Sequence, residues 1–134
     1  MLLRAKADPD ARDKFGKTAL MWAASAGNEK LATLLWRGGA SLDAHDQVGW
    51  DPLFAAAHGG HLRLVTVWMQ RADLERSTAD GTTVLMAAAQ AGRAAVVRML
   101  LTRKADPSRA NAKGQRALEL ATAGKHDETA AMLR

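Results

Sequence analysis

The chain of 134 residues contains no cysteine and no tyrosine, and only 2 phenylalanines and 4 tryptophans. Without cysteine, disulfide scaffolds, zinc fingers, iron–sulfur clusters and thiol nucleophiles are excluded. No apolar run reaches the roughly 18 residues of a membrane span, and residues Met1 to Lys6 lack the apolar stretch of a secretory signal. These absences predict a soluble protein and fit a cytoplasmic location.

Hydrophobic residues make up 48% of the chain, and alanine alone occurs 29 times. Because an alanine side chain buries little apolar area, a core built from it depends on close approach of backbones. This composition favours tightly stacked short helices.

Glycine recurs at a nearly fixed period. The spacings are 33, 32 and 33 residues between Gly16, Gly49, Gly81 and Gly114. Each of these glycines is followed four residues later by a leucine, namely Leu20, Leu53, Leu85 or Leu118. A period of this length predicts an array of repeated structural units.

Each unit has the pattern of two helices. Leu20 and the Ala23-Ala24 pair follow the i, i+3, i+4 spacing of one helix face. Thr18 is expected to begin this helix and Gly27 to end it. Leucines at 31, 34 and 35 predict a second helix in the same unit. No such unit buries its own apolar face, so the units must stack.

Two segments carry the signature of a known family. Residues 13–27, DKFGKTALMWAASAG, and 49–61, GWDPLFAAAHGGH, resemble the ankyrin repeat. The connections at 39–43 and 105–108 resemble the Gly-Ala-Asp-x-Asn segment of that family, and the likeness extends over nearly the whole chain. It implies an all-α solenoid of stacked antiparallel helix pairs with β-turn fingers. The finger tips and first helices would then form a concave groove.

The repeat period divides the chain into one ankyrin-repeat domain, 1–134. We expect the tail of a partial repeat at 1–12, full repeats at 13–45, 46–77 and 78–110, and a C-terminal repeat at 111–134. The chain is thus expected to begin inside a repeat. This suggests a fragment of a longer array, or a chain that covers its open N-terminal end by self-association.

The histidine of the family's Thr-Pro-Leu-His motif is absent from every copy. Met21, Phe54 and Met86 stand in its place in the first three units. Two interpretations stay open: this apolar row packs under the fingers, or it forms an apolar strip in the groove.

The second unit is one residue shorter than the first. It has only Arg71-Ala72 where the first has Gly38-Gly39-Ala40. Without a glycine to adopt a positive φ, the second helix is expected to end differently and to shift the following finger.

Three histidines and two aspartates cluster in the second unit and raise the question of a metal or acid–base site, namely His45, Asp46, Asp51, His58 and His61. Gly59 and Gly60 interrupt the helix between the last two, so structural roles are favoured. The serines lie outside any nucleophile-elbow context, and the glycines keep the repeat period rather than the spacing of a phosphate-binding loop. We therefore expect no enzyme, no bound metal and no cofactor.

Charge is uneven along the chain. Residues 77–134 carry nine basic and five acidic side chains and no aromatic residue. Because nucleic-acid sites add a concentrated basic stripe or stacking aromatics, nucleic-acid binding is disfavoured. Attraction to an acidic protein surface fits this charge better.

The tryptophans fall at different kinds of position. Trp22 and Trp68 lie on apolar helix faces and are expected to be buried. Trp36 is expected in the core or half-buried at the edge of the stack. Trp50 falls at a finger tip, where it either contacts a partner or packs flat against a neighbouring finger.

The resemblance also implies which side chains face a partner, since they lie at finger tips, connections and exposed sides of first helices. In chain order these are Lys14, Phe15, Lys17, Ser25, His45, Gln47, Val48, Trp50, His58, Asp80, Thr82, Gln90 and Lys113. Two functional interpretations follow. The first is a non-catalytic scaffold that binds a protein partner in its groove. The second is a structural or regulatory segment of a longer chain that packs on its flanking domains or self-associates.

Overall fold

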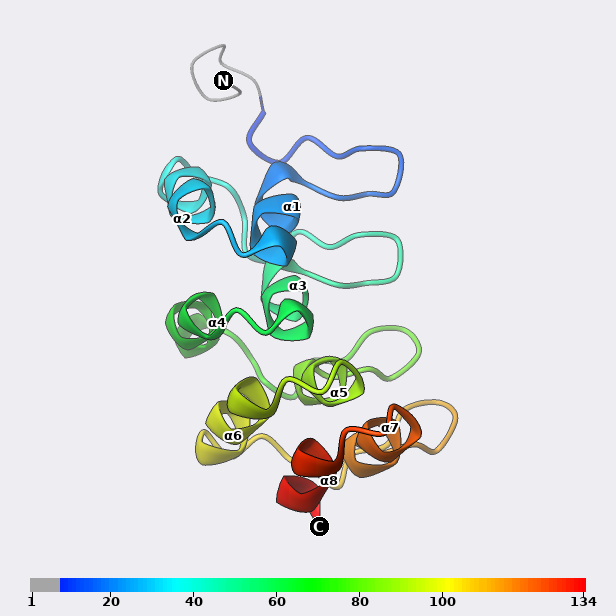
Figure 1. The fold of residues 1–134 in the computed structure, drawn as a ribbon. Helices are drawn as coiled ribbons and strands as arrows, with labels where there is room; N and C mark the ends of the chain where they lie inside the picture. Colours follow the sequence, from blue (N-terminus) through cyan, green and yellow to red (C-terminus); the bar gives the residue numbers. More distant parts are fainter. Residues whose placement is uncertain (1–7) are drawn as a thin grey trace.

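The computed structural model describes residues 8–134, so most of the expected tail at 1–12 lies outside it (Figure 1). The described residues form eight α-helices and one 3₁₀-helix, η1, and no β-strand. In chain order the elements are α1 (Ala19–Ala26), α2 (Glu29–Arg37), α3 (Pro52–Gly59), α4 (Leu62–Trp68), η1 (Met69–Arg71), α5 (Val84–Gln90), α6 (Ala94–Thr102), α7 (Ala117–Ala123) and α8 (Asp127–Leu133). None of the described helices is long and apolar enough to cross a membrane.

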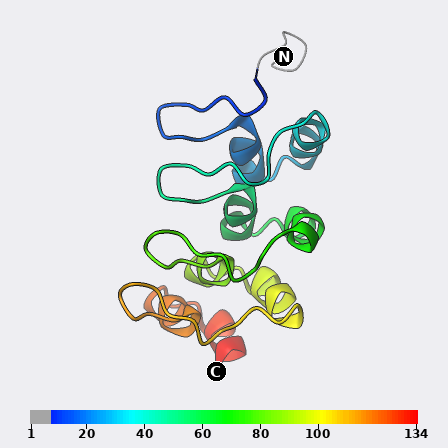
Figure 2. The ribbon, with the colours of Figure 1, turned by 180° about the vertical axis from the view of Figure 1, so that it is seen from behind.

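The helices form two rows in a stack. One row is α1, α3, α5 and α7, each packed on the next, and α2, α4, α6 and α8 lie beside it (Figures 1 and 2). Four loops project to the same side of the stack, away from the second row. The all-α solenoid of helix pairs predicted from the repeat is confirmed.

The four projecting loops are fingers closed by the same hydrogen bonds. They comprise residues 13–17, 46–50, 78–82 and 111–115, and we number them 1 to 4, each with the helix pair that follows as one unit. In finger 1, Asp13 N donates to Lys17 O at 2.9 Å and Gly16 N donates to Asp13 O at 2.9 Å. The Asp13 carboxylate also accepts from the backbone N–H groups of Phe15 and Lys17, each at 2.9 Å. An acidic or polar first residue therefore fixes the finger shape locally.

The first helices begin and end where the sequence predicts. Thr83 holds in unit 3 the place of Thr18, and the sequence marks both as helix starts. Their hydroxyls accept from the N–H groups of Met21 and Met86, each at 3.3 Å, and so cap α1 and α5. Gly27 ends α1 in the left-handed conformation, with φ of +73°. These caps satisfy helix-end groups that would otherwise lack partners.

The apolar row is core. Met21, Phe54 and Met86 are almost fully buried, as is Trp68 on α4. Trp36 is half-buried, with its ring edge-on to that of Trp68 at 6.4 Å between centroids. Of the two interpretations of the row, packing under the fingers is therefore correct.

The expectation that Trp22 is buried is wrong, since 51% of its surface is exposed. Its counterpart in unit 2, Ala55, lines a hollow together with Met21 and Ser25 of unit 1. The described residues give Trp22 no such neighbour on that side. Its indole N–H instead donates to the Asp13 carboxylate at 2.9 Å.

Side chains from the loops between paired helices tie consecutive units together. His61 Nε2 donates to Ser25 O at 2.9 Å, and His126 Nε2 donates to Gln90 O at 3.0 Å. Arg93 takes the same place between units 2 and 3, donating from Nε to His58 O at 2.8 Å. His61 is thus a structural residue, as its position after glycine suggested.

Replacing His61 by alanine should lower the free energy of unfolding by about 1–3 kcal/mol, because a hydrogen bond and ring packing between units are both lost. The ring is held closely, since a Cβ added at Gly27 would lie 2.4 Å from it. Urea denaturation measures the change, and His45→Ala is the matched control because His45 is exposed. Equal urea midpoints for the two variants would show that the contact of His61 with Ser25 does not stabilise the stack.

Unit 2 ends as its missing residue predicts. Helix α4 ends at Trp68 and η1 follows it directly. Ala72 then adopts an extended conformation, with φ of −111°. The corresponding connections use a positive φ, +106° at Gly39 and +66° at Lys104. The shorter connection therefore leaves the helix by a different path.

Candidate functional site

An open cleft lies between fingers 1 and 2. Its volume is about 330 Å³, and it is lined by Phe15, Lys17, Asp46, Gln47, Val48 and Trp50. Two apolar tips stand beside it in solvent, with Phe15 48% and Val48 66% exposed. We call this the finger cleft.

Backbone contact between the two fingers sets the width of the finger cleft. Gln47 N donates to Phe15 O at 3.2 Å, and Gln47 Nε2 donates to Lys14 O at 3.0 Å. A Cβ at Gly16 would lie only 3.1 Å from Gln47 N, so glycine permits this approach. The cleft is thus held by main-chain groups and is formed before any partner arrives.

Trp50 is half-buried and packs on its own helix rather than on a neighbouring finger. Its ring centroid lies 6.0 Å from that of Phe54 and 5.0 Å from that of His58. The remaining surface of the indole lines the finger cleft. Trp50 is therefore both an anchored core residue and a potential contact residue.

Two lysines lie over aromatic rings of unit 1. Lys14 Nζ is 5.2 Å from the Phe15 ring centroid, and Lys17 Nζ is 5.0 Å from that of Trp22. Both distances fall within the range of cation–π attraction. The finger cleft therefore combines an apolar surface with positively charged rims.

A second hollow, the helix hollow, continues from the finger cleft toward α1 and α3. It has a volume of about 260 Å³ and shares Lys17, Asp46 and Trp50 with the finger cleft. Ser25 and His58 line its helix side. Burial, aided by the charge of Arg93, lowers the pKa of His58, so its imidazole is uncharged at neutral pH.

A third hollow of about 190 Å³ lies between fingers 3 and 4 and is polar. It brings together Asp80, Thr82, Gln90 and Lys113 with Asn111, Ala112, Gln115 and Leu120. Large exposed apolar side chains are absent from its described lining. The face formed by the fingers and first helices thus has an aromatic half on units 1 and 2 and a polar half on units 3 and 4.

The structure gathers eleven of the thirteen expected contact residues into these three hollows. Lys14 lies beside them, against the Phe15 ring. His45 lines none of them; its ring nitrogen Nδ1 lies 3.4 Å from Asp43 O in the connection. Asp46 and Asn111 line hollows but were not among the expected contacts, because their position at the start of a finger indicates only a turn-forming role.

Both aspartates that line the helix hollow already accept hydrogen bonds. Asp46 accepts from Val48 N and Trp50 N, each at 3.0 Å. Asp51 accepts from Phe54 N and Arg76 Nη2, each at 2.9 Å, and burial raises its pKa. Among the described residues, no group of three or more His, Cys, Asp and Glu is placed to hold a metal ion.

Acid should destabilise the fold. Hydrogen bonds from Lys17 N and from the Thr78 hydroxyl lower the pKa values of Asp13 and Asp80. A carboxyl group whose pKa is lower in the folded chain than in the unfolded chain stabilises the fold at neutral pH. This stabilisation is lost as the pH falls below about 4. Asp51, whose pKa is raised, acts in the opposite direction.

Thermal melts across this pH range measure the loss. Hydrogen bonds also lower the pKa values of Asp106 and Glu119, so the lowered carboxyls outnumber the raised one. The Asp80→Asn variant keeps an oxygen acceptor but cannot titrate, so its melting temperature should fall less in acid. An equal fall in both proteins would show that Asp80 does not contribute.

Comparison with known proteins agrees with this geometry. The family model described as ankyrin repeats, in three copies, matches residues 1–75 and 56–134. The chain is also 42% identical over 53 residues to neurogenic locus notch homolog protein 1 of Danio rerio, a stretch covering 40% of this chain and 2% of that protein. The chain therefore spans only a small part of that relative. With its four finger-and-helix-pair units, the chain belongs to the ankyrin-repeat family.

Proposed function

We propose that the chain is a non-catalytic module that binds a protein partner through its concave face, with the finger cleft as the main anchor. Ankyrin repeats are in general protein–protein interaction modules. The observation that carries the proposal is the placement of Phe15 and Val48 at finger tips beside a preformed cleft. Exposed apolar anchors surrounded by polar groups are the usual source of interface energy.

The charge of the second half supports a partner with an acidic surface. Residues 77–134 have nine basic against five acidic side chains. Such an excess accelerates encounter with an acidic protein, and added salt should slow association.

Affinity capture with a pair of double variants tests the proposal. Phe15→Ala with Val48→Ala removes the two tips. Leu34→Ala with Val67→Ala is the matched control, because these side chains, each 47% exposed, lie on α2 and α4 in the second row. Proteins retained from cell extract by the wild type and the control, identified by mass spectrometry, should be lost with the tip variant. Undiminished capture by the tip variant refutes the finger cleft as the anchor.

Self-association is a second candidate, favoured by the exposure of Trp22 at the first helix of the stack. An exposed indole of this size is a plausible contact between two copies. Sedimentation velocity should then show a concentration-dependent dimer that Trp22→Ser reduces to a monomer. A wild-type monomer at all concentrations excludes this candidate.

A further inference from the structure

The first and last junctions between units are each joined by the same two hydrogen bonds, which we call ties. One runs from backbone to backbone between fingers, and the other runs from a backbone N–H to a side-chain carboxylate between connections. Between fingers, Gln47 N donates to Phe15 O at 3.2 Å, and Ala112 N donates to Asp80 O at 2.8 Å. The equivalent groups at the middle junction, between units 2 and 3, are Ala79 N and Val48 O. They form no hydrogen bond, although the structure describes both residues.

The second tie joins the connections that precede consecutive fingers, and it too is absent only from the middle junction. Ser41 N donates to the Asp10 carboxylate at 2.7 Å. Asp106 N donates to the Glu75 carboxylate at 3.0 Å. The equivalent pair, Asp73 N and the Asp43 carboxylate, is not bonded in the described part of the chain.

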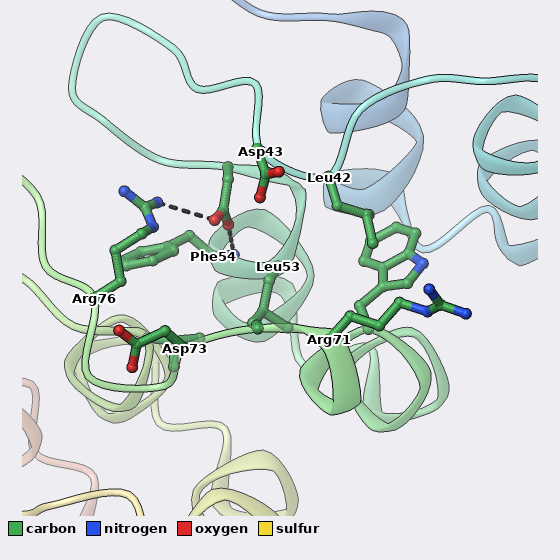
Figure 3. A pocket seen from close by; sticks show the side chains of 11 residues that line it. Leu42, Asp43, Leu53, Phe54, Arg71, Asp73 and Arg76 are labelled. Atoms are coloured by element: carbon green, nitrogen blue, oxygen red, sulfur yellow. Dashed lines mark hydrogen bonds and ion pairs between the residues drawn. The ribbon is translucent and has the colours of Figure 1, made fainter.

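A hollow opens where these ties are absent. It has a volume of about 290 Å³, and both Asp43 and Asp73 line it (Figure 3). Ala72, in the connection that is one residue short, is only half-buried, whereas its counterparts Ala40 and Ala105 are buried. The missing residue therefore leaves the connections at the middle junction less tightly packed than those at the other junctions, while α3 still packs on α5.

Two arginine side chains bridge the middle junction. Arg93 donates to His58 O, as described above, and Arg76 takes the place of the missing ties. Arg76 Nη2 donates to Gly49 O at 3.1 Å and to the Asp51 carboxylate at 2.9 Å. The second bond is the dashed line drawn from Arg76 in Figure 3. The Arg76 guanidinium also lies 4.9 Å from the Phe54 ring centroid. Long side chains of this kind can keep their contacts while the backbones on either side rotate, whereas the direct backbone bond between fingers at the other junctions restricts such rotation.

We propose that the middle junction is a hinge built into the stack. Units 1 and 2 move as one block and units 3 and 4 as another, with the Arg76 contacts as the pivot and the connection at 71–77 absorbing the change. The hinge itself is independent of the proposed function. If a partner does occupy the groove, the hinge sets the angle between its aromatic and polar halves, which is a consequence that rests on the proposed function.

Distance measurements between spin labels test the hinge directly, because the chain has no native cysteine to react with the label. Three equivalent pairs of exposed positions each cross one junction, from a finger to a second-row helix. They are Lys14→Cys with Arg63→Cys, Gln47→Cys with Ala95→Cys, and Ala79→Cys with Glu128→Cys. The pair across the middle junction should show a distance distribution at least about twice as wide as the other two. Equal widths in all three pairs overturn the proposal.

Two further variants keep the test independent of any one substitution. A glycine inserted between Arg71 and Ala72 restores the length of the connection and should narrow the middle distribution to the width of the others. Arg76→Ala removes the pivot contacts and should broaden it while leaving the other pairs unchanged. A middle pair that responds to neither change overturns the hinge. No partner is present in these measurements, so their failure leaves the proposed binding function intact, and loss of that function leaves the hinge intact.

Discussion

Replacing Phe54 by alanine should lower the free energy of unfolding by about 3–5 kcal/mol, whereas replacing Phe15 should change it by less than about 0.5 kcal/mol. These are the only 2 phenylalanines in the chain. Phe54 is 2% exposed and contacts Trp50 and Arg76, so its removal leaves a cavity in the core. Phe15 is exposed at a finger tip, and its backbone tie to Gln47 survives the substitution.

Chemical denaturation followed by circular dichroism measures both effects, and partner capture separates them further. Phe15→Ala should keep the fold but no longer capture the partner, whereas Phe54→Ala should destabilise the fold itself. Because domains of this size are stable by only about 5–15 kcal/mol, Phe54→Ala should remove a large share of the free energy of unfolding and clearly lower the denaturation midpoint. A large loss of stability from Phe15→Ala would mean that the tip is part of the core.

Replacing Gly81 by alanine should cost about 3 kcal/mol or more, and replacing Gly114 only about 1 kcal/mol. The two glycines hold the same position in fingers 3 and 4, with φ values of +82° and +77°, so the backbone strain is matched. They differ in their surroundings. A Cβ at Gly81 would lie 2.9 Å from Asn111 Cα in the next finger, and a Cβ at Gly114 would meet nothing within 4 Å.

The other two finger glycines extend this series. A Cβ at Gly16 would meet backbone at 3.1 Å, and one at Gly49 would meet the Thr78 side chain at 3.2 Å. The atom met at Gly49 is the Cβ of buried Thr78, which is fixed to its backbone, so Gly49→Ala should cost about as much as Gly16→Ala. Thermal melts of the four alanine variants rank the costs. If Gly114→Ala is as costly as Gly81→Ala, contact between fingers does not account for the loss.

Much of the fold could be predicted because the same sequence pattern occurs in four repeats. The period located the fingers and first helices, and Thr18 and Thr83 marked helix starts that the structure confirms. The fate of Met21, Phe54 and Met86 could not be read from the sequence, since methionine and phenylalanine suit both a core and an apolar groove. Only the packing of one unit on the next buries them.

Features that depend on neighbouring units were harder to predict. The counterparts of Trp22 in units 2 and 3 are Ala55, which is half-buried, and Ala87, which is buried. Burial at this position requires a unit packed on the outer side of α1, and the described residues form none there. The short connection of unit 2 did signal a local change. The loss of both ties at the middle junction could not be predicted, because it depends on where Ala79 N and Asp73 N lie relative to the neighbouring unit.

Site-specific photo-crosslinking tests the binding of a partner at the finger cleft most directly. A photoreactive phenylalanine analogue is placed at Phe15 in one protein and at Leu34 in another, and each is irradiated in cell extract. Both positions are nearly half exposed, at 48% and 47%, so their access to solvent is matched. Our account predicts crosslinked partner from Phe15 and none from Leu34; crosslinking from Leu34 alone would contradict it.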